Sequence, residues 1–264
     1  MRLSPVAPWR DHTEMVPSHA TVLSVWAHPD DEAFVAAGAL AGAAGRGCRV
    51  VSVYATLGEH GWQGAPERRP RDLGGVRSRE LAGALAALGV DEWRCLGYPD
   101  GGLAGIPFMD GVARLLDILE DVRPDHVITF GSDGFTGHPD HRTVSAWTTA
   151  AVRHWDASIT TVRHTAITEE WADRFAPALS EVNAFWPGHP VATPASELTW
   201  SRRLDERLLD RKIAALRAHR SQTARLFATF GEPFLRAMAA TEWFRAPTPA
   251  RRAEQTCHAF ALQR

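Results

Sequence analysis

Two segments of the chain are rich in histidine and aspartate, residue types that bind metal ions. The first is AHPDDE (27–32) and the second is GHPDH (137–141). Two imidazoles and one carboxylate, from His28, Asp31 and His141, form a ligand set that suits a borderline-soft ion such as zinc. Three protein ligands leave a coordination position open for water, as in catalytic zinc sites. The residues therefore predict a metal centre that activates water for hydrolysis.

The spacing within each segment is compatible with such a centre. His28 and Asp31 can reach one ion if the chain turns tightly between them, and Pro29 favours a turn. His138 precedes His141 by three residues. If His141 lies on the first turn of a helix, His138 is close to the metal without having to bind it.

Each segment follows a predicted strand and begins a predicted helix, which places both at one edge of a sheet. Strands alternating with helices predict an α/β, Rossmann-like three-layer fold, with a mostly parallel sheet flanked by helices. In such folds ligands bind beyond the carboxyl ends of the strands. The predicted strands are 21–27, 49–56, 93–96 and 126–130, and the predicted helices are 32–44, 77–88, 109–121, one starting near 140, and 204–219.

No linker or repeat divides the chain, so residues 1–264 are predicted to form a single hydrolase domain. Residues 1–19 are expected to be an irregular N-terminal extension. Residues 167–203 contain four prolines and are expected to be irregular and to cover the substrate side of the site. The pattern of the last forty residues favours no particular element.

Composition excludes several other classes of protein. The net charge of -2 gives no general attraction to nucleic acid or to an anionic membrane. No stretch is apolar for long enough to span a bilayer, and the N-terminus lacks the apolar run of a signal peptide, so a cytoplasmic location is expected. No glycine-rich nucleotide-binding motif follows a predicted strand.

The two segments together resemble the PIG-L/LmbE-like family of zinc-dependent de-N-acetylases. That family includes deacetylases of N-acetylglucosaminyl conjugates and mycothiol S-conjugate amidases. The resemblance extends over residues 20–225, because further segments match in order: TLGEHG (56–61), RSRELAGALAALGV (77–90), LGYPDGGL (96–103) and RKIAALRAHRSQ (211–222). It implies a zinc cofactor, with iron as an alternative in the cell. It also implies a small-molecule amide substrate, namely an amino-sugar conjugate.

The resemblance also implies roles for the residues around the metal. Asp30 would be the general base that deprotonates the attacking water. His138 would stabilise the oxyanion and help to protonate the leaving amine. Asp140 would orient His138. Three further residues match positions that contact the sugar in family members: Glu59, Arg77 and Asp100.

Two positions depart from the patterns found in the family. Mycothiol S-conjugate amidases commonly have a lysine where this chain has Val35, which favours a deacetylase over an amidase. Some relatives have a catalytic tyrosine where this chain has Thr136, whose short hydroxyl cannot replace a phenol. A non-catalytic, metal-containing sugar-binding protein is an alternative of another class. Asp30 and His138 argue against it, because neither is needed merely to hold a metal.

Several of these residues also have structural interpretations. Arg77 and Glu80 could form an exposed pair on one helix face. Glu59 could cap a loop, and Asp100 could begin a turn. His219 could satisfy the carbonyl groups at the end of a helix.

Overall fold

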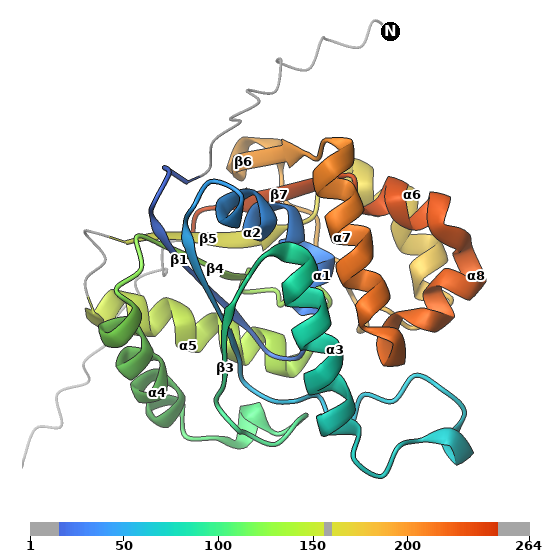
Figure 1. The fold of residues 1–264 in the computed structure, drawn as a ribbon, viewed down its shortest axis with the longest axis horizontal. Helices are drawn as coiled ribbons and strands as arrows, with labels where there is room; N and C mark the ends of the chain where they lie inside the picture. Colours follow the sequence, from blue (N-terminus) through green and yellow to red (C-terminus); the bar gives the residue numbers. More distant parts are fainter. Residues whose placement is uncertain (1–15, 156–159, 248–264) are drawn as a thin grey trace, which may run out of the picture.

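The computed structural model of the chain describes residues 16–155 and 160–247. At its centre is a seven-stranded sheet with the order β3-β2-β1-β4-β5-β7-β6 (Figure 1). Strands β1 to β5 pair in parallel, whereas β7 is antiparallel to both β5 and β6. The strands are β1 (Thr21–Trp26), β2 (Arg49–Tyr54), β3 (Glu92–Cys95), β4 (His126–Phe130), β5 (Thr161–Ala166), β6 (Leu198–Arg203) and β7 (Thr241–Arg245).

Helices cover both faces of the sheet and complete the three layers. Helices α2, α3 and α7 pack together on one face, and α4 and α5 pack together on the other (Figure 1). The helices are α1 (Asp31–Val35), α2 (Ala37–Ala44), α3 (Leu73–Leu88), α4 (Phe108–Val122), α5 (Pro139–Trp155), α6 (Glu169–Ser180), α7 (Glu206–Ala218) and α8 (Arg220–Ala239). The predicted Rossmann-like α/β fold is confirmed.

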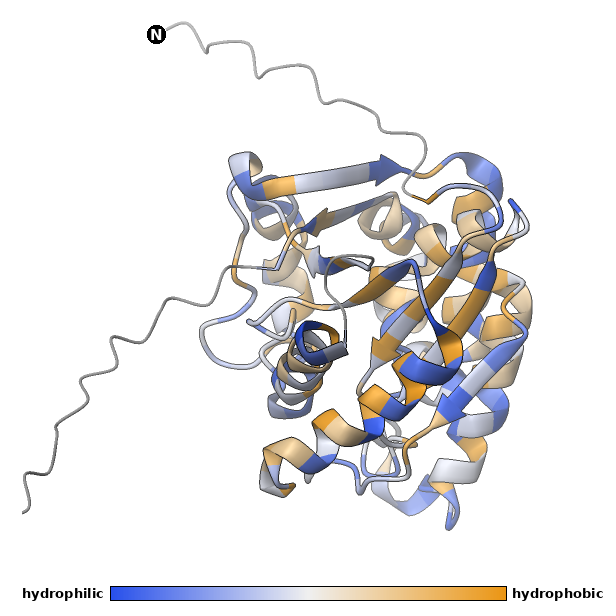
Figure 2. Cartoon of the chain, turned by 90° about the vertical axis from the view of Figure 1, so that its left-hand side faces the viewer, coloured by the Kyte–Doolittle hydropathy of each residue, from blue (hydrophilic) through white to orange (hydrophobic). Residues whose placement is uncertain are grey.

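The central strands are hydrophobic along nearly their whole length, as parallel strands covered on both faces must be. Every residue of β1 after Thr21 is buried, as is every residue of β2 after Arg49 and of β4 after His126. Figure 2 shows these strands as hydrophobic bands in the interior, whereas the helices carry hydrophilic residues on their outer faces. The buried core therefore fixes the positions of the carboxyl ends of these central strands.

The predicted helix 32–44 is instead two helices, α1 and α2, because the backbone leaves the helical conformation at Ala36 (φ -145°). The break frees the backbone N–H groups of Gly38 and Ala39. Both donate to the buried carboxylate of Glu242 on β7, at 2.8 and 2.9 Å. The same carboxylate accepts a 2.8 Å hydrogen bond from Lys212 on α7. The start of α2 is thus anchored to β7, which lies about 200 residues later in the chain.

The expectation for residues 167–203 is corrected by the structure, because this segment contains α6 and β6 as well as loops. Helix α6 forms despite Pro177 because Trp171, Phe175 and Leu179 recur every four residues and are buried on one face. The unassigned C-terminal region supplies most of α8 and all of β7. Most of the expected N-terminal extension lies outside the described residues. No helix within the described ranges is long and apolar enough to cross a bilayer.

Close packing between α4 and α5 depends on Gly111. A Cβ atom at Gly111 would lie 2.2 Å from the indole of Trp147, which is itself buried. We therefore expect Gly111→Ala to lower the free energy of unfolding by about 1–3 kcal/mol, measured by urea denaturation. Gly83→Ala on α3 is the matched control, because its Cβ would meet no atom closer than 3.7 Å. The control should be neutral or stabilising, and equal losses in both variants would contradict this packing.

Candidate metal centre and active site

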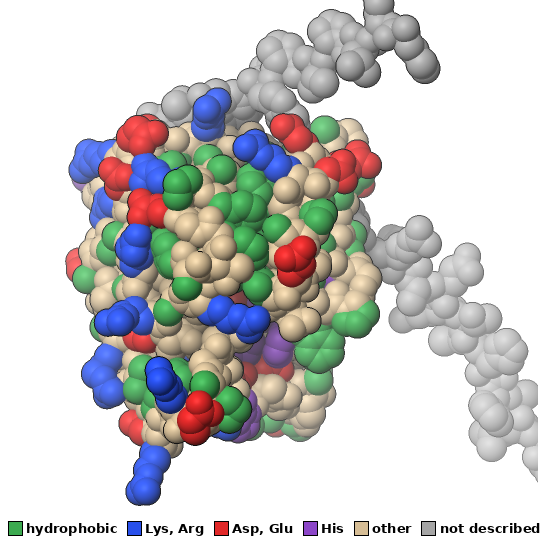
Figure 3. Space-filling view, turned by 90° about the vertical axis from the view of Figure 1, so that its right-hand side faces the viewer, with side chains coloured by type: hydrophobic (Ala, Val, Ile, Leu, Met, Phe, Trp, Pro, Cys, Tyr) green, Lys and Arg blue, Asp and Glu red, His purple; other side chains and the backbone are tan. Residues whose placement is uncertain are grey.

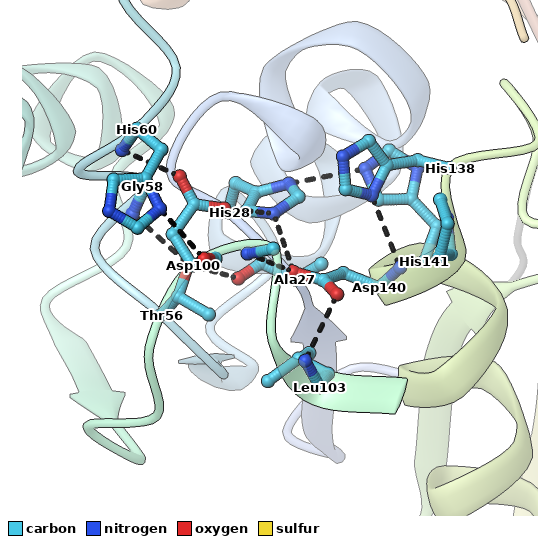
Figure 4. Close-up of polar contacts among 12 residues, drawn as sticks. Ala27, His28, Thr56, Gly58, His60, Asp100, Leu103, His138, Asp140 and His141 are labelled. Carbon is cyan, nitrogen blue, oxygen red and sulfur yellow. Dashed lines mark hydrogen bonds and ion pairs between the residues drawn. The ribbon is translucent and has the colours of Figure 1, made fainter. Parts of the chain in front are cut away.

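The candidate site lies where β1 and β4 are neighbours in the sheet. The chain leaves β1 toward α2 and β2, and leaves β4 toward α5 and β5, so the strand order reverses at this point. Such a switch point opens a crevice beyond the carboxyl ends of the strands. His28 follows β1, Asp31 begins α1, and His141 is in the first turn of α5. The fold brings all three to one place, and Figure 4 shows the contact between His28 and His141.

The three side chains converge with spacings that fit one metal ion. His28 Nδ1 lies 3.3 Å from His141 Nε2. One oxygen of Asp31 is 3.2 Å from His141 Nε2, and the other is 3.9 Å from His28 Nδ1. Ligands bound about 2.0–2.2 Å from a tetrahedral ion are themselves about 3.3–3.6 Å apart. The donor set can therefore hold a metal ion.

The other ring nitrogen of each histidine, His28 Nε2 and His141 Nδ1, faces oxygen acceptors. In the neutral rings the proton therefore lies there, and His28 Nδ1 and His141 Nε2 present lone pairs to a metal ion. His28 Nε2 lies 3.0 Å from Asp100 Oδ1 and 3.3 Å from Asp140 Oδ2, both of which can only accept its proton. His141 Nδ1 lies 3.0 Å from the carbonyl oxygen of Gly134. Hydrogen bonds of this kind fix the tautomer and the ring orientation of metal-binding histidines.

The charges of the cluster favour a cation. Burial lowers the pKa of His28, but hydrogen bonds to Asp100 and Asp140 and the charge of Asp31 outweigh it and raise the pKa to about 10. Burial raises the pKa of Asp31, but His141 and His28 outweigh it and lower the pKa to about 2. The carboxylates around His28 thus favour positive charge at this histidine, and the two histidines keep Asp31 ionised.

Asp140 contacts a different histidine from the one expected. Its fully buried carboxylate accepts hydrogen bonds from the N–H groups of Gly101 (2.8 Å) and Leu103 (3.2 Å), and it faces His28. Only the backbone N–H of Asp140 contacts His138, by donating to Nδ1 at 3.1 Å. The first turn of α5 causes this difference, because it points the side chain of Asp140 toward the loop after β3.

His138 is therefore oriented by the backbone. Because its Nδ1 accepts a hydrogen bond, the neutral ring carries its proton on Nε2. Burial lowers the pKa of His138 to about 4, and the neighbouring His28 and His141 contribute to this lowering. The ring packs edge-on against His28, with 4.9 Å between centroids, and lines the cavity. A neutral Nε2–H donor thus stands beside the ligand cluster.

The contacts of Asp140 lead to a testable expectation for metal affinity. Asp140→Asn replaces one of the two carboxylates that accept the His28 proton with a group that can also donate, so the favoured tautomer and ring orientation are held less strongly. We expect the Kd for zinc to rise by about 10- to 100-fold, measured by competition with a chelator of known affinity. Asp117→Asn, at an exposed position on α4, is the matched control. An unchanged Kd in Asp140→Asn would contradict the assigned contact.

Asp30 lies beside the cluster in a strained backbone conformation. Its φ of 115° is in the region that side chains rarely adopt. Its N–H donates to Glu32 at 3.1 Å, and its carboxylate pairs with Arg77 at 3.2 Å. Burial raises the pKa of Asp30 to about 6, against the lowering effect of Arg77. Asp30 is thus held next to the site without joining the ligand set.

Glu32 and His219 hold Asp30 in position through a contact between them that the sequence did not predict. Both are completely buried, and Glu32 Oε1 lies 2.8 Å from His219 Nε2 while Oε2 accepts the N–H of Asp30. Glu32 belongs to the AHPDDE segment, and this was the available signal. His219 lies 187 residues away, between α7 and α8, and the sequence offered the end of a helix as one interpretation of it.

The three residues expected to bind substrate are all near the site but have different contacts. Arg77 is buried, so it is not part of an exposed helical pair; it pairs with Asp30 and donates to the carbonyl of Gly58 at 2.9 Å. Asp100 orients His28. Glu59 accepts the N–H of Asp100 at 2.9 Å and lines an adjoining, shallower pocket. Arg77 and Asp100 line the main cavity.

A two-histidine, one-aspartate cluster at the switch point of an α/β sheet is an arrangement that could hold a metal ion in a ligand-binding crevice. The profile of the GlcNAc-PI de-N-acetylase (PIG-L) family matches residues 23–152. The 1D-myo-inositol 2-acetamido-2-deoxy-alpha-D-glucopyranoside deacetylase of Acidothermus cellulolyticus is 36% identical over 238 residues, with coverage of 77% of this chain and 80% of that protein. The enzyme of the same name from Mycolicibacterium vanbaalenii is 35% identical over 78% of this chain and 81% of that protein.

Solved structures share the fold. The conserved protein TT1542 from Thermus thermophilus is 26% identical, with a TM-score of 0.59 and coverage of 88% of this chain and 96% of that one. The N,N'-diacetylchitobiose deacetylase from Pyrococcus horikoshii is 22% identical, with a TM-score of 0.61 and coverage of 86% and 83%. The chain belongs to the PIG-L family of de-N-acetylases and is a hydrolase of amide bonds.

Proposed function

We propose that this chain is a zinc-dependent de-N-acetylase of N-acetylglucosaminyl-type small-molecule conjugates, built as a single domain. The observation that supports it best is the convergence of His28, Asp31 and His141, with Asp30 and His138 beside them. Those residues lie within the part of the chain that matches the family profile. The deacetylase relatives named above act on an N-acetylglucosaminyl-inositol compound, which supports the substrate class.

Zinc is the proposed ion because two imidazoles and one carboxylate are ligands that zinc prefers, and iron is the alternative. Bound there, a divalent cation acts as a Lewis acid that polarises the amide carbonyl and acidifies water. His28, Asp31 and His141 would hold it. The fit rests on the donor spacings and on the ring orientations fixed by Asp100, Asp140 and Gly134.

The protein residues supply the proton transfers and the charge stabilisation. Asp30 accepts a proton from the attacking water, because it is a buried carboxylate beside the ligands and outside their set. His138 presents Nε2–H to the developing oxyanion and then to the leaving amine. Arg77 keeps the Asp30 carboxylate in place through their 3.2 Å ion pair. Thr136 stands where some relatives have a tyrosine, and its hydroxyl lies 3.2 Å from His141 Nδ1.

The proposal is tested by assaying amine release from a panel of amides with added zinc. The panel contains 1D-myo-inositol 2-acetamido-2-deoxy-alpha-D-glucopyranoside, N,N'-diacetylchitobiose and a mycothiol S-conjugate. Hydrolysis of the first two in preference to the third is expected. Preference for the S-conjugate would instead establish the amidase alternative. Amine release from none of them would contradict the proposed substrate class.

A further inference from the structure

The cavity at the metal cluster is much larger than an acetyl group requires. It has a volume of about 440 Å³ and includes His28, Asp31, His138 and His141 in its wall. An acetyl group has only three non-hydrogen atoms, so the rest of the cavity is free for the amine half of the substrate and for a longer acyl group. In Figure 3, histidine and acidic side chains lie in a hollow that is flanked by hydrophobic side chains.

One side of the cavity is polar. His60, Gln63 and Asp100 line it there, in the loops that follow β2 and β3. His60 also lines the adjoining shallow pocket, together with Glu59 and Arg69. Charged groups and exposed backbone can hydrogen bond the hydroxyl groups of a sugar or polyol. This side therefore suits the amine half of the substrate, which carries the sugar.

The opposite side of the cavity is apolar. It is formed by α1, the end of β5, α6 with the loop that follows it, and α8. Its side chains include Val35, Ile167, Trp171, Leu179, Phe185 and Leu226. The indole N–H of Trp171 donates to the carbonyl of Met238 at 2.9 Å, so the only polar atom of that side chain is already satisfied.

The buried charged groups in this part of the wall are also satisfied within the protein, and the one exposed charge there belongs to Arg225 on α8. Lys212 and Glu242 pair with each other at 2.8 Å, and Glu242 additionally accepts the two N–H groups at the start of α2. The pair therefore offers no free charge to a ligand. An apolar chamber of this kind gains most from a hydrocarbon occupant.

An amide has two halves, and the ligand cluster lies between the two sides of the cavity. With the sugar on the polar side, the acyl group must extend into the apolar chamber. We propose that the preferred substrate carries a hydrocarbon acyl group longer than acetyl on the amino-sugar nitrogen. This inference rests on the proposed amide hydrolysis and specifies its substrate: N-acylglucosaminyl conjugates are cleaved better than their N-acetyl counterparts.

The test uses the zinc-loaded wild-type enzyme and one glucosaminyl-inositol conjugate acylated with acetyl, butanoyl, hexanoyl or octanoyl groups. Each buried methylene is expected to raise kcat/KM about threefold. The octanoyl substrate should therefore exceed the acetyl substrate by at least about 100-fold. Released amine is measured, so every substrate gives the same product.

The outcomes separate this inference from the proposed function. A rise of kcat/KM with chain length supports the apolar chamber as the acyl site. Hydrolysis of the acetyl substrate with equal or lower kcat/KM for the longer ones would overturn the inference and leave deacetylation intact. Hydrolysis of none of the four would overturn the proposed function itself.

A substitution that fills the apolar chamber tests whether the acyl group binds there. Ala184 follows α6 and lines the cavity. In Ala184→Trp, the octanoyl-to-acetyl ratio of kcat/KM should fall by at least about tenfold, because the indole takes the space of several methylenes. Ala82→Trp, at an exposed position on α3, is the matched control and should keep the wild-type ratio. An unchanged ratio in Ala184→Trp would place the acyl group elsewhere and overturn the inference.

Discussion

Asp30→Asn is expected to lower kcat by about 10²- to 10⁴-fold while the protein keeps one equivalent of metal. The Asp30 carboxylate pairs with Arg77 and lies outside the set formed by His28, Asp31 and His141. Its removal should therefore leave the ligands in place and abolish proton acceptance. Asparagine has the same size, and it tolerates a positive φ as aspartate does. The variant thus changes the chemistry without adding strain.

The measurement combines amine release at saturating substrate with metal analysis of the same sample by inductively coupled plasma mass spectrometry. Asp117→Asn on α4 is the matched control, because the carboxylate there is exposed and does not line the cavity, so the change should leave kcat unchanged. Wild-type turnover in Asp30→Asn would exclude Asp30 as the base. Loss of metal in that variant would instead place Asp30 among the ligands.

His141→Ala is expected to lose both the metal and the activity. The substitution removes one of three protein ligands, and the remaining histidine and aspartate retain little affinity for the ion. Turnover should fall to background, since the Lewis acid is lost together with the acidified water. Excess zinc should restore little of the activity. The same metal analysis and amine assay check this result.

The ring of His141 also stacks on Phe130, with 4.2 Å between the ring centroids, so a packing defect must be separated from a ligand defect. His126→Ala at the start of β4 is the matched control, because this half-buried histidine is at the opposite end of the strand. The control should keep its metal and its activity. Retention of metal with wild-type affinity in His141→Ala would contradict the assigned ligand set.

The ligand set could be predicted from the sequence because it depends on local features. His28 and Asp31 are three residues apart, and His141 follows another apolar strand. Carboxyl ends of parallel strands meet at one edge of a sheet. The sequence did not show that β1 and β4 are neighbours in the sheet, and this pairing is seen only in the structure.

The contacts around the ligands were harder to predict because they join distant parts of the chain. Asp100 and Asp140 both reach His28, from loops after different strands. The family resemblance implied that Asp140 would orient His138, but the side chain of Asp140 points toward His28 instead. The pairing of Glu32 with His219 depends on how α7 packs over α1.

The edge of the sheet beyond β4 was the least predictable part of the fold. Strand β7 pairs with β5 although three helices and β6 lie between them in the chain, and β6 pairs with β7 through a register irregularity. Pro177 indicated a break where α6 continues. In that helix, burial of Trp171, Phe175 and Leu179 outweighs the lost backbone hydrogen bond. The pairing of β7 with β5 and β6 depends on tertiary packing, which local patterns do not encode.

A crystal structure of the zinc-loaded protein, with anomalous scattering recorded across the zinc edge, would locate the ion. One peak is expected about 2.0–2.2 Å from His28 Nδ1, an oxygen of Asp31 and His141 Nε2. A second group of donors, His28, His138 and Asp140, also lies close enough together to hold an ion. A peak between those three residues, on the Nε2 side of His28, would contradict the assigned ligand set and the roles of Asp30 and His138.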